Sequence, residues 1–81
     1  MKLSKAQKEI VGLMKDGWEL GHSQGMHPRA WIQKGGVGRG GDTMKMSMST
    51  FHVLLDKNLV ELSLKSFPTS KYNLTELGKS I

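Results

Sequence analysis

Hydroxyl and lysine side chains gather in two stretches of the chain, and their chemistry suits contacts to phosphate. The first stretch leads into an expected helix, and the second surrounds an expected turn that contains no acidic residue. Ammonium and hydroxyl groups donate hydrogen bonds to phosphate oxygens, as do the free N–H groups at the start of a helix. The residues expected to contact nucleic acid are Lys45, Ser47, Ser49, Thr50, His52, Lys57, Lys65, Ser66, Thr69, Ser70 and Lys71.

Both stretches also have a simpler interpretation. The helix spanning 48–57 has no arginine off its apolar stripe, and Asp56 would repel phosphate. Side chains that read base edges are usually Arg, Asn or Gln, so this face is equally well explained as the solvated side of a helix that completes the core. For the lysines around the turn, the simpler interpretation is that they keep a strand edge from pairing with other chains. The sequence leaves these alternatives open.

The sequence also contains parts of three other functional patterns, and each of them is incomplete. His22, His27 and His52 have no metal-ligand spacing and no cysteine beside them, so we expect no metal site. Residues 36–41 match G-x-G-x-x-G, but the chain is too short for the parallel strand–helix–strand sheet of a dinucleotide site. No local signature pairs a nucleophile with a base, so we expect neither catalysis nor a cofactor.

Residues 35–42 predict a flexible loop. Five of the seven residues from 35 to 41 are glycine, and no single backbone conformation of such a segment forms at low entropic cost. Arg39 is the residue of this loop expected to contact a phosphate or a partner. The simpler alternative is a plain connector.

Composition sets the remaining limits. Eighty-one residues allow one small domain, here residues 1–81, and the absence of cysteine excludes disulfides. The longest apolar run, Ile10 to Met14, is too short to span a membrane, and no signal-peptide pattern is present, so we expect a cytoplasmic protein. The net charge of +5 suits an anionic partner, but the excess is spread along the chain. Only folding could collect it on one face.

Periodicity predicts an α+β order of elements that begins with a helix from about Ser4 to Asp16. Ser4 and Gln7 form a capping box at its start, and Gly17 is placed to end it. A hairpin then returns through residues 30–33, with a contact expected between Trp18 and Trp31 across the two strands.

The second half predicts a helix, a hairpin and a short terminal helix. Met44 and Met46 indicate a short extended entry, Ser47 or Ser49 caps the helix, and Asn58 fits its left-handed end. Residues 60–65 alternate as a strand, residues 67–70 turn, and residues 71–74 return. Thr75 is placed to cap the terminal helix.

Residues 47–79 resemble the second half of a winged helix-turn-helix domain. The resemblance rests on Ser49-Thr50-Phe51, Leu54-Leu55, Asn58-Leu59-Val60-Glu61 and the closing segment from Tyr72 to Gly78, which has the form Y-x-LT-x-x-G. The first helix matches the family's first helix. The resemblance implies that residues 48–57 are a recognition helix and residues 65–72 a wing, both facing double-stranded DNA.

Residues 18–42 depart from that pattern, because they hold a hairpin and glycines where a standard winged helix has its second helix. The whole layout, which opens with Leu3-Ser4 and closes with the Tyr72 strand, is similar to that of the small bacterial YjhX-type proteins. That family is associated with blocking a DNA-processing enzyme through protein contact. We therefore expect a non-enzymatic DNA-binding protein, a small transcriptional regulator of bacterial or phage origin. The alternative is a protein-interaction module that binds or inhibits another protein through the hairpin and the methionine-rich entry of Met44, Met46 and Met48. A homodimer is compatible with either function.

Overall fold

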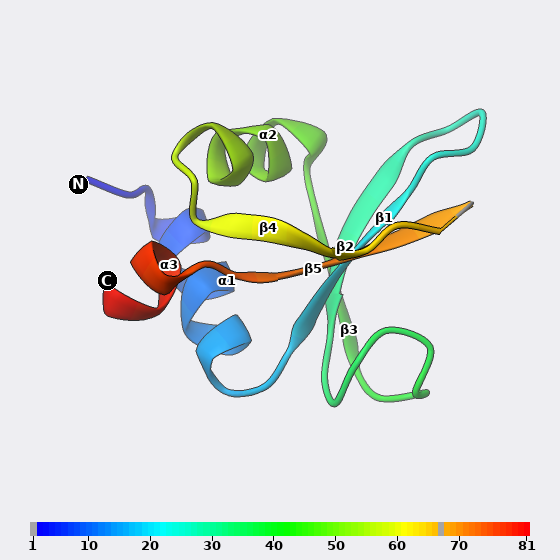
Figure 1. Cartoon of the computed structure of the whole chain (residues 1–81), viewed down its shortest axis with the longest axis horizontal. Helices are drawn as coiled ribbons and strands as arrows, with labels where there is room; N and C mark the ends of the chain where they lie inside the picture. Colours follow the sequence, from blue (N-terminus) through cyan, green and yellow to red (C-terminus); the bar gives the residue numbers. More distant parts are fainter. Residues whose placement is uncertain (1, 67) are drawn as a thin grey trace.

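The computed structural model describes residues 2–66 and 68–81, and these residues form three helices and one five-stranded antiparallel sheet (Figure 1). The strand order is β3-β2-β1-β5-β4, so β3 and β4 are the edges of the sheet. The predicted α+β class is therefore correct. Met1 and Phe67, the first residue of the turn predicted for residues 67–70, lie outside the described residues. In chain order the elements are α1 (Lys5–Lys15), β1 (Glu19–Ser23), β2 (Arg29–Gln33), β3 (Thr43–Met46), α2 (Met48–Asp56), β4 (Val60–Leu64), β5 (Thr69–Leu74) and α3 (Glu76–Ser80).

The ends of α1 follow from the residues that flank it. The Ser4 hydroxyl accepts the Gln7 N–H at 3.2 Å, and the Gln7 side chain accepts the Ser4 N–H at 3.0 Å. This is the predicted capping box. Beyond the last turn, Gly17 has a φ of +99°, a conformation that side chains disfavour. Both predicted boundaries of the first helix are confirmed.

The predicted first hairpin is confirmed and extended by a third strand. Residues 43–46, expected as an extended entry to a helix, pair with β2 as β3. The predicted contact between Trp18 and Trp31 is wrong, because the register places Trp31 opposite Gly21. Trp18 precedes β1 and packs against the core. The correct pairing depends on the register of the two strands, and the sequence between them does not determine it.

The core lies between one face of the sheet and the helices. Leu20 and Ile32 are fully buried on this face, together with Phe51 and Leu54 from α2. Met44, Met46 and Met48 pack against the same core. Side chains alternate between the two faces of a sheet, so the opposite face carries Trp31, Lys45 and Lys71. The glycine-rich loop binds to one end of that face.

The second half contains the predicted elements. Ser47, not Ser49, is the N-cap of α2, and Asn58 takes the predicted left-handed conformation with a φ of 60°. In the hairpin that follows, the register shifts between Leu62 and Leu64, which places these two side chains on opposite faces of β4. Thr75 caps α3.

Candidate nucleic-acid interface

The start of α2 presents a small cluster of hydroxyl groups. The Ser47 hydroxyl accepts the Thr50 N–H at 3.1 Å and lies 2.9 Å from the Thr50 hydroxyl, so the two hydroxyls also bond to each other. Ser49 and His52 are exposed on the outer side of the helix. Lys57 lies at the other end, as the C-cap. The outer side of α2 therefore has polar groups at its start and its single lysine at its end.

The two hairpins are joined at their tips, at the right of Figure 1. The Gln24 N–H donates to the Pro68 carbonyl at 2.7 Å, and the Gln24 amide lies 2.7 Å from the Ser70 hydroxyl. We call this part of the molecule the hairpin end, consisting of residues 24–28, 65–66 and 68–69. The turn of the first hairpin thereby supports the predicted wing, and no local sequence pattern predicts this contact between distant residues.

Burial changes the set of predicted contact residues at this end. Lys65 and Ser66 are exposed, and Thr69 is partly buried. Ser70, expected to contact phosphate, is fully buried, and its hydroxyl also donates to the Ser66 carbonyl at 3.2 Å. That expectation is wrong, because Ser70 lies on the core side of β5. Residues 20–41 and 62–75 contain no Asp or Glu, so the hairpin end has no carboxylate.

Lys45 and Lys71 lie on the other face of the sheet from α2. Lys45 is opposite Trp31, Trp31 is opposite Gly21, and Gly21 is opposite Lys71. The structure therefore divides the predicted interface into two surfaces. It also adds Arg29, which is exposed on β2, and Trp31. Strand alternation assigns these residues to one face, but only the register shows which of them are neighbours.

The glycine-rich loop has specific partners in the structure. The Val37 N–H donates to the Glu19 carboxylate at 2.8 Å, and the Gly38 N–H donates to the Gln33 side chain at 3.1 Å. Val37 is buried. These two N–H groups are occupied by the protein's own side chains, so they cannot bind phosphate in this conformation. Arg39 is exposed; the mobility predicted for the loop stays a prediction.

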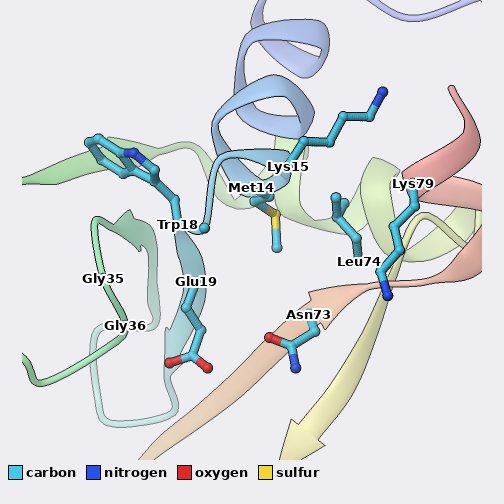
Figure 2. A pocket seen from close by; sticks show the side chains of 10 residues that line it. Met14, Lys15, Trp18, Glu19, Gly35, Gly36, Asn73, Leu74 and Lys79 are labelled. Atoms are coloured by element: carbon cyan, nitrogen blue, oxygen red, sulfur yellow. The ribbon is translucent and has the colours of Figure 1, made fainter.

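A hollow of about 620 Å³ lies between the end of α1, the start of β1 and α3. Figure 2 shows the Glu19 carboxylate and the Asn73 amide on one side of it, whereas the Lys15 ammonium points away. Lys15 instead bonds to the Ile81 carbonyl, and Lys79 lies 3.8 Å from the Glu76 carboxylate. The described residues that line the hollow supply no hydroxyl, thiol or imidazole. They therefore provide no pair of a hydroxyl or thiol nucleophile with an imidazole base.

His22 lies on the core face of the sheet. Its ring centroid is 4.7 Å from that of Phe51 and 6.5 Å from that of Tyr72. Neither ring nitrogen has a hydrogen-bond partner among the described residues. His52 is exposed on α2, and His27 is exposed in the first turn. Within the described part of the chain, no three His, Asp or Glu side chains come together as metal ligands would.

None of the helices formed by residues 2–66 and 68–81 combines the length and apolar character needed to cross a membrane. Comparisons with protein families, with curated proteins and with solved structures found no match for this chain.

Proposed function

We propose that the chain is a non-enzymatic DNA-binding domain of the winged-helix type, in which the hairpin end and the start of α2 contact the duplex backbone. The observation that carries the proposal is the joining of the two hairpin tips by Gln24. This contact supports an exposed lysine, Lys65, in a region without any carboxylate. A tip whose backbone is held in this way suits phosphate binding because less of the chain has to be ordered when the duplex binds.

The arrangement of elements supports the same proposal. A helix and a strand come first, then α2, then the β4–β5 hairpin, and β5 lies between β1 and β4 in the sheet. This is the order that the resemblance to winged helices implies. The β2–β3 pair occupies the position in the chain where the second helix of that family would stand. The proposal therefore assigns duplex contact to the hairpin end and to α2, without a helix-turn-helix pair.

The polar groups at these two places favour contacts to phosphate over reading of bases. Ser49 and His52 on α2 are exposed, but the helix has no arginine and its lysine lies at its far end. Bidentate contacts to base edges carry most discrimination between sequences, and Gln24, the residue of the hairpin end with suitable chemistry, has its amide bonded to Ser70. We therefore expect binding that differs little between DNA sequences and weakens steeply with salt.

A single lysine tests the contact. Lys65→Ala should lower affinity for duplex DNA about three- to fivefold at low salt, and by the same factor for unrelated sequences. It should also reduce the slope of log affinity against log salt by about one, because one phosphate contact is lost. Fluorescence anisotropy of a labelled duplex over a salt series measures both quantities.

Lys5→Ala is the matched control. Lys5 is exposed at the start of α1, which lies at the opposite end of the molecule from the hairpin tips (Figure 1). The substitution removes the same charge and leaves a good helix former. Equal losses of affinity in the two variants would contradict the proposal, because net charge alone would then explain binding. Duplex affinity that does not depend on salt would contradict it as well.

One observation favours the second candidate, a protein-interaction module. β4 is an edge strand, and its two leucines, Leu62 and Leu64, are 47% and 51% exposed. Exposed apolar side chains on a free edge suit pairing with another strand, including that of a second copy. The methionines expected at such a contact pack against the core instead.

The second candidate predicts self-association that depends on β4. Sedimentation velocity over a concentration series should show a dimer, and Leu64→Lys should shift it to monomer by placing a charge on the paired edge. Met26→Lys is the control, because Met26 is 95% exposed but lies in the turn of the first hairpin. A chain that stays monomeric at all concentrations would exclude this edge as a homodimer interface.

A further inference from the structure

A row of residues crosses the face of the sheet that lies away from α1 and α2. Lys45 on β3, Trp31 on β2, Gly21 on β1 and Lys71 on β5 are successive cross-strand partners. We call these four residues the Trp31 row. Because cross-strand partners share a face and lie close together, Trp31 has Lys45 beside it on one strand, and Gly21 followed by Lys71 on the other side.

Gly21 lets the indole lie close to the sheet. A Cβ atom at Gly21 would come within 2.7 Å of Trp31 Cζ2 and within 2.8 Å of Cε2. On one side, the ring is bordered by Val37, whose Cγ2 atom also lies over Gly21. On the other side, a hollow of about 260 Å³ opens among Arg29, Trp31, Thr43 and Lys45. The indole is therefore supported by the sheet on one side, and on the other side it borders a hollow lined by Arg29 and Lys45.

The charged residues on this face are distributed unevenly about the Trp31 row. A second row lies two residues away from the Trp31 row along each strand. It consists of Arg29, Ser23 and Thr69 and also contains no acidic side chain. In the other direction along the strands, Glu19 accepts the Val37 N–H of the glycine-rich loop. Glu61, opposite Asn73 on β5, lies on the same side of the Trp31 row as Glu19, whereas the strand residues on the other side, around Arg29, include no carboxylate.

We propose that this face binds single-stranded nucleic acid. One base enters the hollow and stacks on Trp31, and the backbone phosphates on either side contact Arg29, Lys45 and Lys71. A single strand fits because its bases are free to leave their stack, whereas bases in a duplex present only their edges. This binding is separate from the proposed duplex contact, which uses α2 and the hairpin end.

The tryptophan content of the chain makes a direct measurement possible. The chain has two tryptophans, and Trp18 packs against the core. In a Trp18→Phe background, fluorescence therefore reports on Trp31 alone. A deoxythymidine oligomer of about ten nucleotides should quench this fluorescence, because a stacked base lies in contact with the indole. A uridine oligomer of the same length shows whether the 2′-hydroxyl changes affinity, and binding of either oligomer supports the proposal.

Variants of the row test the stacking itself. In the natural background, Trp31→Ala should lower affinity for the labelled oligomer about tenfold, measured by anisotropy, and Trp31→Phe should recover most of that loss. Lys45→Ala should weaken binding about threefold and reduce the salt slope by about one. Circular dichroism establishes that each variant is folded. If Trp31→Ala is folded but binds weakly and Trp31→Phe binds well, the aromatic ring itself is needed for binding. A residue that served only to pack the domain would not show this difference between two folded variants.

The outcomes separate this proposal from the duplex proposal. Lys65→Ala should weaken duplex binding while leaving oligomer affinity within about twofold, and Trp31→Ala should do the reverse. Absence of oligomer binding, or equal affinities for the natural chain, Trp31→Ala and Trp31→Phe, would overturn the single-strand proposal. Oligomer binding without duplex binding would support it and overturn the proposed function.

Discussion

Replacing Gly78 by alanine is expected to lower the free energy of unfolding by about 3 kcal/mol, a large part of the roughly 4–12 kcal/mol expected for a domain of this length. Gly78 is buried in α3, and an added Cβ would collide with the backbone carbonyl oxygen of Leu59. It would also lie 3.0 Å from a methyl carbon of Leu74. A backbone oxygen cannot rotate away as a side chain can, so the helix or the turn must move.

The contacts around Thr75 oppose that movement. Its hydroxyl donates to the Asn58 carbonyl at 2.6 Å and accepts the Gly78 N–H at 3.0 Å. Its own N–H donates to the Leu59 carbonyl at 2.9 Å. These bonds hold the start of α3 against the turn that follows α2. Displacing α3 to make room for a methyl group would lengthen them and leave buried polar groups without partners, which adds to the cost.

Gly12 provides the matched control for this substitution. It is exposed in α1, and a Cβ added there would meet no atom within 4 Å. Gly12→Ala should therefore stabilise the domain by about 0.5–1 kcal/mol, because alanine loses less backbone entropy in a helix. Urea unfolding followed by circular dichroism measures both variants. A Gly78→Ala chain as stable as the natural one would show that α3 does not pack as described.

Features that depend on a few neighbouring residues were predictable from the sequence. The capping box of Ser4 and Gln7, the left-handed Asn58 and the cap at Thr75 all involve residues within about four positions of each other. These features can be predicted because the interacting groups are close together in the sequence. The need for glycine at position 78 is different, because the group that excludes a side chain there belongs to Leu59.

Features that depend on register and on distant contacts were not predictable. Ser70 has the chemistry of a phosphate donor, but its position on the core side of β5 and its bond to Gln24 remove it from the surface. The two partners are separated by 46 positions. Likewise, the sequence predicts one interface for Lys45, Lys71 and the helix 48–57, and only the register shows that the two lysines share a row with Trp31 on the other face.

The second large effect concerns His22, whose replacement should change how stability depends on pH. The ring is packed against Phe51, and both its nitrogens are buried without a hydrogen-bond partner among the described residues. Burial, and to a smaller extent the nearby His52, lower the pKa of His22 below its ordinary value of 6.5. The phenol of Tyr72 is the other titratable group whose ring approaches it.

The direction of the pH dependence follows from whether His22 binds a proton more tightly in the folded or in the unfolded chain. In the unfolded chain, His22 takes up a proton near its ordinary pKa of 6.5, whereas in the folded chain it does so only at lower pH. Acid therefore favours the unfolded chain. The natural protein should lose stability as the pH falls below about 6.5, and this loss should level off once the pH is below the folded-state pKa of His22.

His22→Phe should remove this dependence and raise stability at neutral pH by about 1 kcal/mol, since it replaces two unpartnered nitrogens by carbon. Urea unfolding between about pH 7.5 and 5 measures both effects above the range in which most carboxylates titrate. His22→Leu is a second, smaller replacement in case the phenyl ring is too large for the site. His27→Gln is the control, because it removes an imidazole from an exposed turn outside the core.

His52→Gln then separates the two causes of the lowered pKa. This variant keeps the burial of the His22 ring and removes the neighbouring charge, so it should retain most of the pH dependence, because burial is the larger cause. A profile that is flat in His52→Gln but unchanged in His22→Phe would instead assign the titration to the surface of α2. In that case the unpartnered nitrogens of His22 would have no measurable effect, and the described packing of this ring against Phe51 would be wrong.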